Sequence, residues 1–123
     1  MAVILVVEDD RPSRRNIALF LRLSGYEVYE AEHGEAALSL LANMQVDVVI
    51  SGLNLPGQLS GIDILDALKT IRRKIDAILV TGRGSDEIKS RAYSLEKPLQ
   101  LGELEKTIQH SSRRYPRPSQ LGS

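Results

Sequence analysis

Polar side chains that could do chemistry stand directly after several apolar runs of this chain. The acidic run Glu8–Asp10 follows the first of them, Thr81 ends a later one, and Lys97 stands beside Pro98. Carboxylate oxygens are ligands that Mg²⁺ prefers, and a lysine ammonium offsets the charge of a bound anion. These groups suit a site for a cation and an anion, provided that the fold brings them to one place.

The elements that would position these groups are strands separated by helices. Continuous apolar runs rich in β-branched residues are typical of strands buried on both faces, and an alternating run indicates a strand nearer the sheet edge. The predicted strands cover residues 3–7, 26–31 (the alternating run), 46–51, 76–81 and, for a last short one, 93–96.

Helices are predicted between the strands. The first starts near Pro12, and its apolar side is expected to comprise Ile17, Leu19, Phe20, Leu21 and Leu23. A second covers 34–43, and a third begins at the helix-start box of Ser60 and Asp63, with apolar residues at helical spacing as far as Ile71. A short fourth helix is expected after residues 85–87, and the last helix covers 99–110.

Alternation of strands and helices predicts an α/β fold: a doubly wound, five-stranded parallel sheet covered on both faces. Polar groups at the carboxyl ends of such strands converge on one crevice. The acidic run, Thr81 and Lys97-Pro98 are therefore expected to meet there. Gly52 stands at the same edge, after the third strand, and begins a turn-rich segment over 52–61 that is expected to be a loop.

Four motifs, in this order and spacing, resemble the receiver domain of bacterial two-component response regulators. They are ILVVEDD at 4–10, VVISGLNLPG at 48–57, LVTGRG at 79–84 and LEKPL at 95–99. The resemblance runs from residue 3 to about 108. It implies a flavodoxin-like fold and transfer of a phosphoryl group from a sensor histidine kinase to an aspartate at the end of the third strand.

The resemblance also assigns metal ligands. Glu8 and Asp9 match the acidic pair that holds Mg²⁺, and the backbone carbonyl of Asn54 matches a further ligand. Asp10 is expected to be the N-cap of the first helix instead. A competing interpretation makes the whole run a solvated helix start. In that case Lys97 pairs directly with Asp9, and no metal is bound.

The phosphate site is assigned in the same way. Thr81 matches the hydroxyl that hydrogen-bonds the phosphoryl oxygens, Lys97 the lysine that pairs with the phosphate, and Pro98 the proline after it, usually joined by a cis bond. An ordinary strand-end role for Thr81 is an equal alternative.

The position that matches the phosphate-accepting aspartate is Gly52, which has no side chain. It offers neither a carboxylate nucleophile nor the matching metal ligand. Ser51 is expected to point to the other face of the sheet, and Asp47 lies at the far end of the same strand. Asn54 carries an amide, which is a poor phosphate acceptor, and modification of Asp9 is the remaining, less favoured route.

Two further departures concern the segment between Thr81 and Lys97, which is about six residues shorter than the family pattern. The fourth helix or the fifth strand must therefore be cut down. The switch aromatic expected three places before the lysine is replaced by Ser94, with Tyr93 one place earlier. We expect loss of the aromatic rather than a shift of register that brings Tyr93 into its place.

Composition fits a single cytoplasmic domain. The 123 residues are 42% hydrophobic and 26% charged, contain no cysteine and include no apolar run of the roughly 20 residues that a membrane-spanning helix needs. The net charge is zero, but residues 1–110 hold thirteen basic and sixteen acidic side chains, and three arginines follow. We expect a receiver-like domain over 1–110, a flexible tail or linker over 111–123, and binding to neither nucleic acid nor membrane.

These features together predict a receiver that cannot be phosphorylated in the usual way and acts by protein–protein interaction, with no cofactor required and Mg²⁺ only weakly bound. Its expected partners are a sensor histidine kinase or another signalling protein, or a second copy through the fourth helix, the fifth strand and the last helix. The alternative is an ordinary phospho-accepting regulator carrying an Asp-to-Gly change at position 52. An enzyme is not expected, because no nucleophile and base converge.

Overall fold

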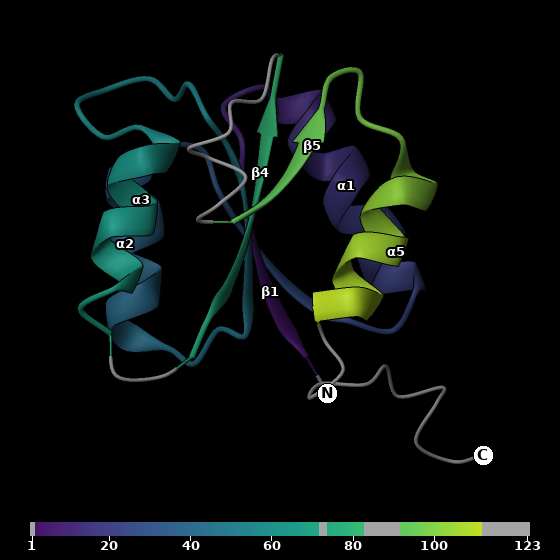
Figure 1. The fold of residues 1–123 in the computed structure, drawn as a ribbon, viewed down its shortest axis with the longest axis horizontal. Helices are drawn as coiled ribbons and strands as arrows, with labels where there is room; N and C mark the ends of the chain where they lie inside the picture. Colours follow the sequence, from purple (N-terminus) through teal and green to yellow (C-terminus); the bar gives the residue numbers. More distant parts are fainter. Residues whose placement is uncertain (1, 72–73, 83–91, 112–123) are drawn as a thin grey trace.

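The predicted strands form one five-stranded parallel sheet in the order β2-β1-β3-β4-β5, which confirms the doubly wound fold (Figure 1). The computed structural model describes residues 2–71, 74–82 and 92–111. The strands are β1 (Val3–Val7), β2 (Glu27–Ala31), β3 (Val48–Gly52), β4 (Asp76–Thr81) and β5 (Tyr93–Glu96). The alternating strand lies at the sheet edge, as its sequence predicts, and β3 starts and ends slightly later than expected.

Two layers of helices cover the sheet, α1 and α5 on one face and α2 and α3 on the other (Figure 1). Their bounds are α1 (Arg11–Leu23), α2 (Gly34–Asn43), α3 (Gly61–Leu68) and α5 (Leu101–Ser111). The expected short fourth helix, residues 72–73 and the tail beyond residue 111 lie outside the described residues. None of the described helices has the length and apolar character needed to cross a membrane.

Helix starts follow the local chemistry read from the sequence. Asp10 is the N-cap of α1, and its carboxylate accepts a hydrogen bond from the Ser13 backbone N–H at 3.1 Å. Ser60 and Asp63 form a complete capping box at α3, each side chain accepting from the other residue's N–H. Both motifs satisfy backbone donors that the first turn of a helix leaves unpaired.

The apolar side of α1 is narrower than predicted. Ile17, Ala18 and Leu21 are buried, but Leu19 is 56% exposed and Leu23 is 79% exposed. With 100° between successive helical residues, positions 19 and 23 lie about 200° and 240° around the helix from Ile17, on the solvent side. The expectation that these two leucines face the core was wrong.

The third helix is shorter than its apolar spacing indicated. It ends at Leu68, and Ile71 lies beyond it, half-buried against the core layer under α2 and α3. The last helix starts at Leu101 rather than at 99, with Leu104 and Ile108 fully buried as predicted. An apolar residue that packs against the core just outside a helix continues the helical spacing of apolar residues, so the sequence predicts a longer helix than the one that forms.

Candidate functional site

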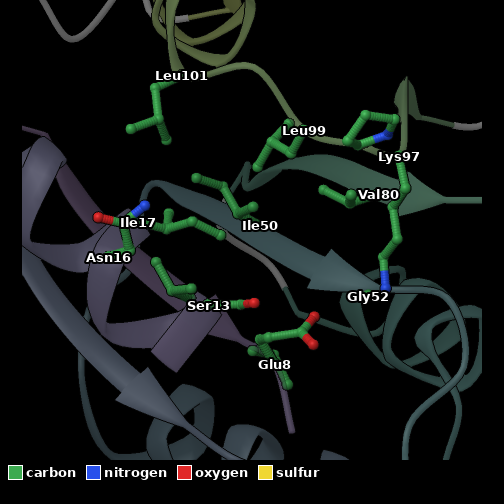
Figure 2. A pocket seen from close by; sticks show the side chains of 13 residues that line it. Glu8, Ser13, Asn16, Ile17, Ile50, Gly52, Val80, Lys97, Leu99 and Leu101 are labelled. Atoms are coloured by element: carbon green, nitrogen blue, oxygen red, sulfur yellow. The ribbon is translucent and has the colours of Figure 1, made fainter. Parts of the chain in front are cut away.

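A pocket of about 280 Å³ opens at the carboxyl ends of the strands, between α1 and the segment that follows β5 (Figure 2). Its polar lining comes from Glu8 after β1, Ser13 and Asn16 on α1, and Lys97 after β5. Its apolar lining comprises Val6, Val7, Ile17, Ile50, Val80, Pro98, Leu99 and Leu101. The pocket therefore has a charged mouth and a hydrocarbon interior.

Glu8 is the buried acid of this mouth. The residue is only 9% exposed, and its Oε1 accepts a hydrogen bond from the Asp10 backbone N–H at 3.3 Å. Burial raises the pKa of its carboxyl above the ordinary value of 4.5, while the Asp10 hydrogen bond and Lys97 act in the opposite direction. The Asp9 carboxylate, exposed beside it, adds to the upward shift.

Lys97 stands on the other side of the mouth. Its backbone N–H donates to the Thr81 carbonyl at 2.7 Å, and its peptide bond to Pro98 is cis. The side chain extends toward Gly52, across from the Glu8 carboxylate (Figure 2). Among the described residues no carboxylate lies within ion-pair distance of this ammonium group, so the direct Lys97–Asp9 pair is not formed.

Gly52 ends β3 between these two charges. A Cβ placed there would lie 3.1 Å from Glu8 Oε2, 3.6 Å from Leu55 Cδ2 and 3.9 Å from the Asn54 carbonyl oxygen. The closest of these atoms is the end of a flexible side chain, so the backbone can accommodate a side chain at this position. With glycine, the mouth holds no carboxylate on β3.

Neither neighbouring candidate replaces the missing group. Ser51 does not line the pocket; its hydroxyl is buried and donates to the Gly52 carbonyl at 2.8 Å. Asp47 accepts a hydrogen bond from the Val3 backbone N–H at 2.8 Å, at the opposite end of the sheet. The alternation of side chains along β3 accounts for the direction of Ser51.

The predicted metal ligands form an incomplete set. Glu8, Asp9 and the Asn54 carbonyl supply hard oxygen donors near the mouth, and this donor chemistry fits Mg²⁺. However, the part of the chain that is described contains no group of three acidic or histidine side chains arranged to hold a metal. Fewer protein ligands would leave more of the coordination shell of Mg²⁺ to water.

Thr81 belongs to the other face of the sheet. It is 2% exposed, does not line the pocket, and its Oγ1 has no hydrogen-bond partner among the described residues. Thr81 is paired in register with Glu96, so Ser94, two residues earlier on β5, shares its face. The buried hydroxyl of Ser94 also lacks a partner within the described residues.

Tyr93, on β5, lies on the opposite face of the sheet from Thr81, on β4. It packs against the core layer under α1 and α5, and its ring meets that of His110 edge-on at 5.9 Å. The register of β4 and β5 does not place Tyr93 beside Thr81. On the face that holds Thr81, Ser94 stands where the family pattern has the switch aromatic.

Two pocket residues, Ser13 and Asn16, were not among the candidates taken from the sequence. Together with Ile17 they lie three and four residues apart on the first turns of α1, directly after the acidic run. Helical spacing therefore places them on the side that faces the strand ends. This spacing in the sequence could have identified Ser13 and Asn16 as pocket residues.

The geometry can be compared with known proteins. A family model described as the response regulator receiver domain matches residues 4–109. A cyclic di-GMP phosphodiesterase of Thermotoga maritima is 34% identical over 116 residues, which is 89% of this chain and 31% of that protein. The phosphate regulon transcriptional regulatory protein PhoB of Pseudomonas aeruginosa is 34% identical over 70% of this chain and 38% of its own length.

Solved structures are similar over nearly the whole chain. A response regulator receiver domain protein from Clostridium thermocellum superposes with a TM-score of 0.82 at 32% identity, covering 93% of this chain and 96% of that one. The chemotaxis response regulator CheY4 of Vibrio cholerae gives 0.81 at 29% identity, covering 90% and 98%. By contrast, this chain spans only about a third of the length of the two curated relatives.

Proposed function

This chain belongs to the response regulator receiver domains of two-component signalling, and from that premise we propose that it is a receiver that takes no phosphoryl group on β3 and works by protein–protein interaction. Gly52 carries this proposal. An acyl phosphate needs a carboxylate nucleophile, and the residue at this position offers only a hydrogen atom.

The surroundings of Gly52 support the proposal. Ser51 is turned away and bonded to a backbone carbonyl, and Asp47 lies at the opposite end of the sheet. Asp9 and Asp10 are exposed carboxylates beside the mouth, but both lie outside the pocket lining, and Asp10 caps α1. A phosphodonor would therefore find no acid in the position from which the family accepts phosphate.

We propose that the retained residues keep their family positions without the family chemistry. Glu8 and Asp9, with the Asn54 carbonyl, would hold Mg²⁺ weakly, and the cation would supply positive charge for anionic oxygens. Lys97 and Pro98 would form the remnant of the phosphate site at the mouth, and Thr81, on the other face of the sheet, would be the remnant of the switch.

Domain limits and partners belong to the same proposal. Residues 1–110 would form the receiver, and 111–123 a linker or tail. Receiver domains interact with histidine kinases and other signalling proteins, and we propose that this one meets such a partner, or a second copy, through β5, α5 and the segment between β4 and β5. We propose that it does so in the cytoplasm, binding neither nucleic acid nor membrane and without enzymatic activity. The match covers only 31% of the phosphodiesterase and 38% of the regulatory relative, so their activities are not carried over.

The test is incubation of the chain with acetyl phosphate and Mg²⁺, followed by intact-mass measurement. We expect no stoichiometric phosphate adduct. An adduct at full occupancy, mapped to any residue of the pocket mouth, would contradict the proposal. Asp9→Asn then identifies whether the neighbouring acid had taken over.

The second candidate is a phospho-accepting receiver in which Gly52 replaces an aspartate. It is favoured by one observation: a Cβ at position 52 meets only the flexible end of Glu8 at close range, so the site retains room for the side chain. In that case Gly52→Asp should become phosphorylated under the same conditions. Continued absence of an adduct in this variant would mean that the remaining site no longer supports the reaction.

A further inference from the structure

From the pocket beside Gly52 we infer a ligand site: it binds a small aliphatic α-amino acid, with the ligand's ammonium group on Glu8, its carboxylate on Lys97 and its side chain in the apolar interior. This inference rests on the proposed function, because a carboxylate on β3 would occupy the mouth. Binding of the amino acid would then be the signal to which this receiver responds in place of phosphorylation.

The two charges of the mouth carry the first step. Glu8 uses Oε1 to accept the Asp10 N–H, whereas Oε2 faces the space above Gly52, 3.1 Å from where a Cβ would stand. Lys97 reaches toward the same space from the other side and forms no ion pair within the described residues (Figure 2). One acceptor and one donor of opposite charge thus line the same pocket mouth.

Charge complementarity selects a zwitterion. A simple anion at Lys97 would stand against the Glu8 carboxylate, and a simple cation at Glu8 would stand against the Lys97 ammonium. An α-amino acid carries both charges a short distance apart, so each can form a charge-assisted hydrogen bond with its opposite. Ser13 and Asn16, on α1, add polar groups on the same rim.

The interior of the pocket selects the side chain. Behind the mouth the walls are aliphatic, formed by Ile17, Ile50, Val80, Leu99 and Leu101 (Figure 2). The volume of about 280 Å³ lies just below the range typical of drug-sized ligands. A branched aliphatic side chain therefore fits, because it removes apolar surface from water without leaving a polar group unpaired.

The experiment is a titration of the full chain with L-leucine in EDTA, so that no Mg²⁺ competes for Glu8, monitored by calorimetry and by the amide chemical shifts of Gly52 and Leu99. We expect saturable binding with a Kd below about 1 mM. Three ligands dissect the contacts: leucinamide lacks the carboxylate, 4-methylpentanoate lacks the ammonium group, and glycine lacks the side chain. Each is expected to bind at least about tenfold more weakly.

Variants test the assigned partners. Lys97→Met and Glu8→Gln keep the length of each side chain and should each lower leucine affinity about tenfold or more. Lys106→Met is the matched control, because Lys106 is exposed on α5 outside the pocket lining. This variant should bind leucine as tightly as the original chain does. Thermal unfolding of each variant verifies that it is folded.

Several results would overturn the inference: no saturable leucine binding at millimolar concentration, equal affinity for leucine and 4-methylpentanoate, or equal losses in Lys97→Met and Lys106→Met. Failure here is separable from failure of the proposed function. Absence of leucine binding together with absence of a phosphate adduct removes only the ligand site, whereas a stoichiometric adduct removes the proposed function itself.

Discussion

Gly52→Asp is expected to destabilise the metal-free protein and to make its stability depend on Mg²⁺. A Cβ at position 52 lies 3.1 Å from Glu8 Oε2, so the new carboxylate stands within about 4 Å of an existing one. Two like charges at that separation repel by about 4 kcal/mol at the effective dielectric of a site near the protein surface. Lys97 across the mouth offsets part of this repulsion.

The net effect follows from the opposing contributions. Replacing a strand glycine recovers about 0.5–1 kcal/mol of backbone entropy, and attraction to Lys97 cancels a further share of the repulsion. We therefore expect a loss of about 1–3 kcal/mol in the free energy of unfolding at neutral pH without metal. For a domain of this size that corresponds to a melting temperature lower by at least about 4 °C.

The assay is thermal unfolding in EDTA and in excess Mg²⁺. A metal that binds only the folded state adds about 2.7 kcal/mol at a concentration of 100 Kd, so Mg²⁺ should more than restore the melting temperature of Gly52→Asp. Gly52→Asn is the matched control, because it has the same size without the charge, and it should show neither the loss nor the Mg²⁺ response. Equal behaviour of the two variants in both buffers would refute the electrostatic reasoning.

Three further predictions test the fold and the charge of the site. Ser60→Ala removes the capping box of α3 and should lower the free energy of unfolding by about 1 kcal/mol in urea, whereas Ser39→Ala, on the exposed side of α2, should leave it unchanged. Leu104→Ala empties a fully buried site under α5 and should cost about 2–5 kcal/mol, while Leu23→Ala should cost almost nothing, because Leu23 is 79% exposed. Glu8→Gln should raise the melting temperature in EDTA at pH 7. Burial raises the pKa of Glu8, so the charged form is the destabilising one, and the gain should vanish as the pH falls below 4.5, where Glu8 is protonated in both states.

The fold was largely predictable because its central strands, such as β1 and β3, are buried on both faces. A strand such as Val3–Val7 must be apolar throughout, and this pattern differs from that of a surface helix. The errors came where one-dimensional spacing is ambiguous. Leu19 and Leu23 are apolar but lie on the solvent side of α1, and Ile71 packs after its helix has ended.

The candidate site was predictable in part for a topological reason. Carboxyl ends of parallel strands meet, so Glu8, Gly52 and Lys97 were expected together, and they line one pocket. Thr81 does not join them, because the pleat of β4 directs its side chain to the opposite face. Which charges pair at this edge depends on side-chain directions, and a linear sequence does not specify them.

Whether this receiver can be phosphorylated is decided by intact-mass measurement after incubation with acetyl phosphate and Mg²⁺, with Gly52→Asp measured in parallel. We expect the original chain to keep its unmodified mass at every donor concentration, whatever the variant does. A stoichiometric phosphate adduct on the original chain would contradict this expectation.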